Sequence, residues 1–232
     1  MRLLRNIYLV GGLDYHLTYT DWPSNDCNVY LVDTRDTLVM VDCGCGETVP
    51  SILTHIRELG LEVRDLSHVL LTHEHLPHSG GAEALRKAGA NVISHQAAAQ
   101  ALNAGDERTS AFHYHKRPVP VEVVMSLADG AEIEIGEAVF RMIHLPGHSP
   151  GSCAYEMEMG GRKVFFTGDV VMNGGMPGRC DNFGFNANAM RSSLLRLLKD
   201  FTPDCVMPGH GPMCFTNATV WIESALSLML RE

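Results

Sequence analysis

The chain has 232 residues, of which 45% are hydrophobic and 19% are charged, as is typical of a folded globular protein and not of a disordered or fibrous one. Its 27 acidic residues outnumber its 18 basic ones, and the formal net charge is -9. This balance disfavours a general nucleic-acid binder, because neutralising phosphates takes an excess of positive charge.

The cysteines and the N-terminal residues bear on where the protein works. Seven scattered cysteines without a Cys-x-x-Cys pair disfavour a disulfide scaffold or a zinc ribbon and favour reduced thiols in the cytoplasm. The apolar run from Ile7 to Leu13 is short and is followed by Asp14, with no small-residue cleavage pattern, so we expect no signal peptide. No uncharged apolar stretch approaches the roughly 18 residues that a membrane span needs, so we expect no contact with a membrane.

The first half of the chain alternates strand and helix patterns. Two short β-rich runs, 28–32 and 38–41, are joined by a polar turn and predict a hairpin. An apolar stripe over 49–59 predicts a helix that stops at Gly60. Further elements are expected as a buried strand at 69–71, a helix over 81–87, a strand over 91–94 and an alanine-rich helix to 102. Residues 104–126 lack clear periodicity and are expected to form a long loop or lid.

The second half opens with two further hairpins, over 133–143 and 153–166. They are followed by an apolar helical stripe over 190–201, a short strand at 205–207 and a closing helix over 218–230 that Asn217 is expected to cap. We expect a single domain over residues 1–232, built from two αβ halves of roughly 1–125 and 126–232. Two sheets packed face to face with helices outside would bury all the apolar stripes.

Three histidines follow the strand predicted at 69–71. His73 and His75 form a His-x-His pair, which places two imidazoles on the same side of an extended backbone, where both can reach one ion. His78 begins the next element and points elsewhere, which suits a neighbouring ion or a substrate group. A cluster of this kind indicates a metal site more than a packing role.

Three more side chains able to bind a metal lie at predicted strand ends beside glycines. They are His148 in the run 145–152, Asp169 after Gly168, and His210 in the run 208–211. An isolated histidine is more often a surface or packing residue. Four glycine-flanked sites after strands, one of them with three histidines, favour a metal-binding centre.

In order and rough spacing, these motifs resemble those of the metallo-β-lactamase superfamily. The runs 28–32 and 41–44 also resemble its opening hairpin, so the resemblance spans about residues 25 to 215. It implies an α/β fold, the four-layer αββα sandwich of two mixed sheets with helices on the outer faces. It also implies an active site at one edge of the two sheets.

The resemblance implies the ligands of one or two metal ions. His73, His75 and His148 would hold a first ion, Asp169 would bridge to a second, and His78 and His210 would complete the second site. Zinc is the ion expected, with iron or manganese as alternatives, and Asp169 is the residue to which a catalytic role is assigned.

Position 77 departs from the family pattern, which has aspartate between the second and third histidines. Pro77 has neither a carboxylate nor a donor N–H, so it cannot ligate, orient water or shuttle a proton. Proline is structurally tolerable there, because it suits the first turn of a helix. We therefore expect the second ion to be bound more weakly and the first site to be unaffected.

The function expected is that of a metal-dependent hydrolase whose activated water attacks a small ester, thioester, lactone or phosphoester. One alternative is a mononuclear iron oxygenase that resembles the persulfide dioxygenases, with His73, His148 and Asp169 as ligands. Another is a binding protein that has lost catalysis, for which Pro77 is the one indication in the sequence. A nuclease is disfavoured by the acidic charge, so the expected partner is a small molecule and not a nucleic acid.

Other chemically capable residues have more ordinary interpretations. Glu74 is expected to be a surface carboxylate, because an extended backbone points it away from its two neighbouring histidines. His113 and His115 are expected in a solvated loop, although they could cover the site. Arg179 is expected near the pocket, where it could meet an anionic substrate. Buried or structural roles are expected for Cys43, Cys45 and the histidines at 16, 55, 68, 95 and 144.

Overall fold

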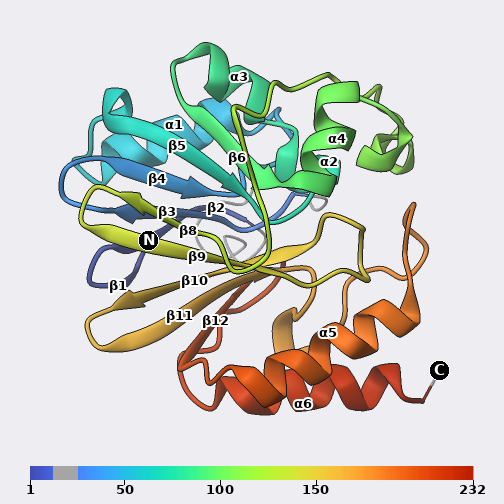
Figure 1. Cartoon of the computed structure of the whole chain (residues 1–232). Helices are drawn as coiled ribbons and strands as arrows, with labels where there is room; N and C mark the ends of the chain where they lie inside the picture. Colours follow the sequence, from blue (N-terminus) through green and yellow to red (C-terminus); the bar gives the residue numbers. More distant parts are fainter. Residues whose placement is uncertain (13–25, 232) are drawn as a thin grey trace.

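The computed structural model describes residues 1–12 and 26–231. Two β-sheets pack face to face, and helices cover the outer face of each sheet (Figure 1). The predicted αββα sandwich is therefore confirmed.

Within the described residues, the first sheet has seven strands in the order β1-β2-β3-β4-β5-β6-β7. Neighbouring strands are antiparallel from β1 to β4 and parallel from β4 to β7, so the sheet is mixed. The strands are β1 (Arg2–Leu4), β2 (Ile7–Gly11), β3 (Val29–Asp33), β4 (Leu38–Val41), β5 (Leu66–Leu71), β6 (Asn91–His95) and β7 (Met125–Leu127).

The second sheet has five strands in the order β12-β11-β10-β9-β8, and it is mixed because β11 and β12 are parallel. Its strands are β8 (Glu132–Ile135), β9 (Ala138–His144), β10 (Cys153–Met159), β11 (Arg162–Gly168) and β12 (Cys205–Pro208). Alternate residues of β9 are exposed over its first half, whereas β3 and β4 are buried almost throughout. The burial of β3 and β4 agrees with their sequences, because a strand that is covered on both faces has a continuous run of apolar residues.

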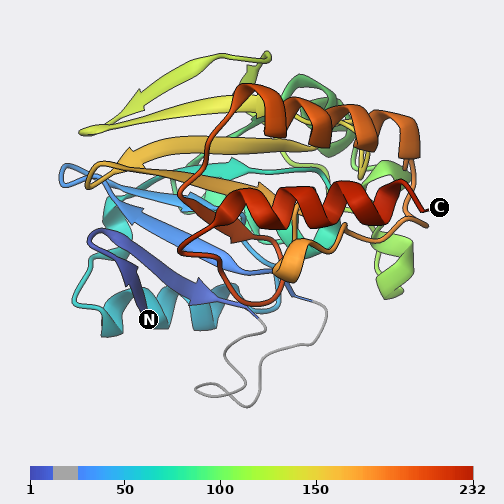
Figure 2. The same ribbon diagram turned by 90° about the horizontal axis from the view of Figure 1, so that it is seen from below.

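The helices divide between the two outer faces. Side chains of α1 (Val49–Glu58), α3 (Ala82–Lys87) and α4 (Gln96–Ala104) pack on the first sheet. Those of α5 (Ala187–Asp200) and α6 (Ala218–Met229) pack on the second sheet, where the two helices lie side by side (Figure 2). Short helical turns complete the described elements: α2 (Leu76–Ser79), η2 (Val63–Asp65), η3 (Glu107–Thr109), η4 (Ala111–Tyr114) and η5 (Asn173–Gly175). In the described part of the chain, no helix combines the length and apolar character needed to cross a membrane.

Several local predictions are confirmed and others are wrong. The hairpin of β3 and β4 is present, and so are the predicted long helices. The segment 104–126 is not a plain loop, because it contains η3 and η4 and enters β7. Asn217 occupies the N-cap position of α6, but its side chain makes no capping hydrogen bond and its φ of 57° is left-handed. The strand β2 was not predicted, although its apolar run was visible.

Strands β5, β9, β11 and β12 all end at one edge of the sandwich, and the loops that follow them carry the candidate ligands. Segments more than one hundred residues apart in the sequence therefore meet there.

Candidate metal centre

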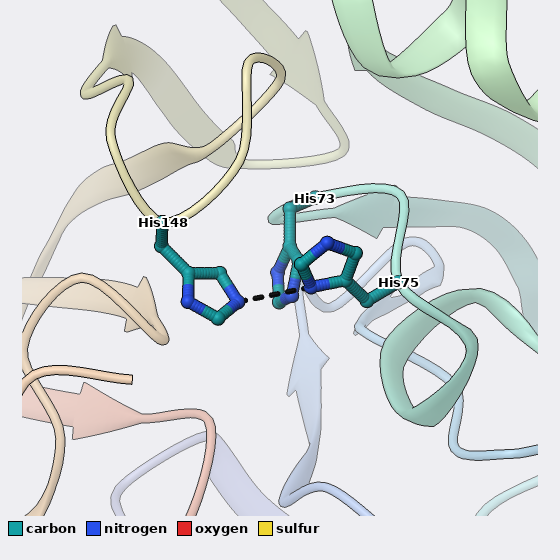
Figure 3. A group of neighbouring side chains, drawn as sticks. All are labelled: His73, His75 and His148. Carbon is teal, nitrogen blue, oxygen red and sulfur yellow. Dashed lines mark hydrogen bonds between the residues drawn. The ribbon is translucent and has the colours of Figure 1, made fainter. Parts of the chain in front are cut away.

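The first histidine group joins the two sheets. His73 and His75 follow β5, with ring centroids 4.7 Å apart, and His148 lies in the loop between β9 and β10. Nδ1 of His75 is 2.9 Å from Nε2 of His148 (Figure 3). One ring nitrogen from each histidine lies within 4.8 Å of the other two. The prediction that the His-x-His pair presents both imidazoles on one side is confirmed.

These three imidazoles are held in their neutral form. Burial, followed by the neighbouring histidines, holds the pKa of His73 and of His75 well below the usual value. Burial lowers the pKa of His148 to about 4. Nε2 of His73 is buried and has no hydrogen-bond partner among the described residues. Neutral imidazole nitrogens in a group this tight have the donor chemistry that zinc prefers, so the residues fit a metal ion.

Asp169 lies between this group and a second one. Its Oδ2 is 3.5 Å from Nε2 of His148, whereas its Oδ1 is 3.3 Å from Nε2 of His78 and 3.8 Å from Nε2 of His210. Within the described chain, Oδ1 of Asp169 and Nε2 of His78 are buried without a hydrogen-bond partner. The structure therefore brings all six sequence-predicted site residues together at one edge of the sandwich.

The charges at this second group oppose the effect of burial. Burial would raise the pKa of Asp169, but His78 and His210 hold that pKa well below its usual range. Burial would lower the pKa of His78, but Cys27, Asp169 and Asp42 hold it well above the usual value. Burial lowers the pKa of His210. An ionised carboxylate is thus kept among imidazoles, as a shared cation site requires.

Asp42 belongs to the candidate site, although the sequence suggested no role for it beyond its place in the opening hairpin. Its Oδ2 is 2.8 Å from Nδ1 of His78, and the backbone N–H and hydroxyl of Thr72 donate to its carboxylate. The signal that could have found it is an aspartate at a strand end beside the strand that leads to His73.

The loop of His210 is held by the first sheet. The side-chain amide of Asn28 donates to the carbonyl oxygens of Pro208 and Gly211, and the Tyr30 hydroxyl also donates to Pro208. Gly209 is needed for a separate reason, since a Cβ there would meet the Asp169 carboxylate. The early strand motif and the late histidine motif therefore form one unit.

Glu74 is not the surface carboxylate that was expected. It is 1% exposed, and its carboxylate accepts hydrogen bonds from the Ser149 hydroxyl at 2.9 Å and the Gly151 backbone N–H at 3.4 Å. Burial raises its pKa. The expectation was wrong because the loop of His148 folds over this side of the turn.

The histidines and cysteines outside the candidate site have exposed or structural positions. His115 is exposed, as expected, but His113 is half-buried, and its Nε2 has no partner among the described residues. His55 has a structural role, because its Nδ1–H donates to the Val10 carbonyl oxygen at 2.7 Å. His16 lies outside the described residues. Cys43 and Cys45 are buried, and burial raises the pKa of both thiols, so neither has the character of a reactive thiolate.

Comparison with known proteins decides the family. The family model described as the metallo-beta-lactamase superfamily matches residues 23–210. The chain belongs to this superfamily. The resemblance found in its motifs is thereby confirmed.

The chain is similar to several individual members of the superfamily. Acyl-coenzyme A thioesterase MBLAC2 of Homo sapiens is 30% identical over 178 residues, which are 66% of this chain and 61% of that protein. Hydroxyacylglutathione hydrolase of Cereibacter sphaeroides is 35% identical over 174 residues, 73% of this chain and 59% of that protein. The chain thus spans about three fifths of the length of these relatives. Among solved structures, BJP-1, a subclass B3 metallo-β-lactamase of Bradyrhizobium japonicum, has a TM-score of 0.78 at 23% identity, covering 100% of this chain and 90% of that one.

Beside the six candidate site residues lies a cavity of about 320 Å³. Pro77 forms part of its wall, at the second position of α2, where a missing backbone N–H has no helical partner to lose. Tyr114, Arg179 and Asn182 line other parts of the cavity. Arg179 lies where expected, but its guanidinium is paired with Asp181 at 2.6 Å.

Proposed function

We propose that this protein is a metal-dependent hydrolase of thioesters, with zinc as its ion. The observation that carries the proposal is the group of neutral, buried imidazole nitrogens of His73, His75 and His148, next to the ionised Asp169 and a cavity large enough for an acyl group. The names of the relatives support the substrate class, because an acyl-coenzyme A is a small-molecule thioester.

The six site residues divide into two ligand sets. His73, His75 and His148 would hold a first ion, and Asp169, His78 and His210 would hold a second. A zinc ion with three histidine ligands supplies an acidic water, with a pKa lowered to about 7, and polarises a carbonyl group.

The chain itself supplies orientation and charge. Asp169 has a pKa well below the usual range, so it stays ionised and is a weak base. We assign its carboxylate the task of accepting a hydrogen bond from the attacking water and orienting it. Tyr114 and Arg179 line the cavity, and we assign both to substrate contact. Tyr114 would donate a hydrogen bond, and Arg179, which pairs with Asp181, would have to exchange that partner for an anionic part of the thiol leaving group.

The test begins with protein purified without added metal, whose metal content is measured and whose hydrolysis of acyl-coenzyme A and acylglutathione thioesters is followed by thiol release. His75→Ala is expected to lose most of the metal and to abolish activity, because it removes one of three ligands to the first ion. His68→Ala is the matched control, since His68 is a partly buried histidine that bonds to Ser67 away from the site. Full metal content in His75→Ala would contradict the assignment.

A second candidate is a mononuclear iron oxygenase. The ligands expected from the sequence were His73, His148 and Asp169. The group of two histidines and one carboxylate whose ligand atoms lie within 4.8 Å of one another has His78 in place of His148. Iron in the purified protein together with oxygen uptake would support it, whereas zinc and thiol release without oxygen uptake would support the hydrolase.

A further inference from the structure

The Glu74 carboxylate connects the two loops that carry the first histidine group. Glu74 stands between His73 and His75 in the sequence, yet its hydrogen bonds go to the loop of His148. Its Oε2 is 2.9 Å from the hydroxyl oxygen of Ser149, the residue directly after His148, and its Oε1 accepts from the backbone N–H of Gly151. A single buried side chain therefore links ligands that come from different sheets.

The loop of His148 is closed upon itself around this contact. The backbone N–H of Leu145 donates to the Ser152 carbonyl oxygen at 2.9 Å, and the hydroxyls of Ser149 and Ser152 lie 2.9 Å apart. The Ser149 backbone N–H also donates to the Ser152 hydroxyl oxygen. The position of Ser149, and so of His148, is thus coupled to the base of the loop and to Glu74 together.

The two parts of the loop are fixed by different neighbours. Its first part is held by α5 and by Asn186, the residue before α5. The Ser193 hydroxyl donates to the Pro146 carbonyl oxygen, and the Asn186 backbone N–H donates to the Gly147 carbonyl oxygen. Its second part meets Glu74. His148 lies between these two attachments, so a change at either one would move its imidazole.

The contact with Glu74 is close-packed and specific. A Cβ built on Gly151 would meet Oε2 of Glu74 and the Cβ of Ala98, so the loop backbone approaches the carboxylate as closely as a glycine allows. Ser149 and Glu74 are 0% and 1% exposed, so water does not compete for their hydrogen bond.

From this geometry we infer that Glu74 is a positioning residue that holds His148 against His73 and His75 through Ser149 and Gly151, and so sets the affinity of the first metal position. The inference rests on the proposed function, because it assumes that these histidines bind a metal. Groups that hydrogen-bond directly to a metal-ligating side chain typically change metal affinity by about 10- to 100-fold when they are removed. Glu74 acts one residue further away, through Ser149 and Gly151, so the lower end of that range is the effect expected.

The experiment titrates metal-free protein with zinc and, separately, with cobalt(II), whose visible spectrum reports the ligand geometry. Glu74→Ala and Ser149→Ala are each expected to weaken binding of the first ion by roughly tenfold or more and to alter the cobalt(II) spectrum. The double variant is expected to lose little more than Glu74→Ala, because the Glu74–Ser149 hydrogen bond that Ser149→Ala removes is already absent in Glu74→Ala. Glu74→Gln keeps an acceptor oxygen for the Ser149 hydroxyl but turns an amide N–H toward the Gly151 N–H, so its first-ion affinity is expected to lie between those of wild type and Glu74→Ala.

Ser94→Ala is the matched control, since Ser94 is a fully buried serine whose hydroxyl bonds to the backbone of its neighbour, His95. Thermal unfolding of the metal-free variants separates a loss of stability from a loss of metal affinity. Should Glu74→Ala fail to fold, Ser149→Ala still decides the question, because it leaves the carboxylate in place. First-ion affinity equal to wild type in Ser149→Ala overturns the inference, whereas a wild type that binds no metal overturns the proposed function instead.

Discussion

Oδ2 of Asp42 lies 2.8 Å from Nδ1 of His78, and both side chains are at most 2% exposed. The Thr72 backbone N–H and hydroxyl donate to the same carboxylate, so Asp42 is fixed by the residue just before His73. Because Nδ1 of His78 faces Asp42, the other ring nitrogen, Nε2, faces Asp169. Asp42 thereby fixes the orientation of the His78 ring, and with it the nitrogen that a second ion would use.

Asp42→Asn is expected to weaken binding of the second ion and to leave binding of the first ion unchanged. The amide keeps the shape of the side chain but removes the charge that fixes His78, so second-ion affinity should fall by roughly 10- to 100-fold. Titration of metal-free protein with zinc measures both binding steps. Equal loss at both steps would mean that Asp42 supports the whole turn of His73 and not His78 in particular.

Asp169→Asn is expected to keep the fold and lower thioester turnover by orders of magnitude. The substitution removes the charge that lies between His148 and His78 while preserving the side-chain volume. Turnover under saturating metal and the circular dichroism spectrum are the measurements. A variant with near-normal turnover would show that Asp169 has a structural role alone.

The sequence was sufficient to predict candidate site residues where a chemically capable side chain stands at the end of a recognisable strand. His73, His148 and His210 were found because each stands at a predicted strand end beside turn residues, and their convergence follows from the two-sheet arrangement. Glu74 was misplaced, because its burial depends on a loop about 75 residues later, which no local pattern reports. The role of Asp42 likewise depends on a parallel strand pairing, β4 with β5, that is non-local.

His95 is expected to make stability depend on pH between about 4 and 6.5. It is 3% exposed, its ring stacks on that of His144 with centroids 3.7 Å apart, and its Nδ1 accepts the Ala97 backbone N–H. Burial, followed by His144, lowers its pKa to about 4, against the opposing charge of Asp129. Because the pKa is depressed in the folded state, this part of the stability is present above the unfolded value, about 6.5, and is lost as pH falls through about 4.

His95→Asn removes this titration and keeps an N-cap acceptor for α4. The difference in unfolding free energy between wild type and His95→Asn, measured by chemical denaturation of metal-free protein, should shrink as pH falls from 7 to 4. Parallel pH profiles for the two proteins would show that His95 is protonated equally in the folded and unfolded states.

Pro77 leads to the prediction that the second ion is bound clearly more weakly than the first. The residue lines the cavity beside His78 and Asp169, where it contributes an apolar ring and no ligand oxygen. Pro77→Asp should raise second-ion affinity by supplying a carboxylate, with a stability cost of about 1 kcal/mol or less from the lost rigidity of the chain. Pro77→Ala is the matched control, because it loses the same rigidity and adds no ligand. Calorimetric titration of the three metal-free proteins decides the matter, and two equally tight ions in wild type would mean that another residue already supplies the missing ligand.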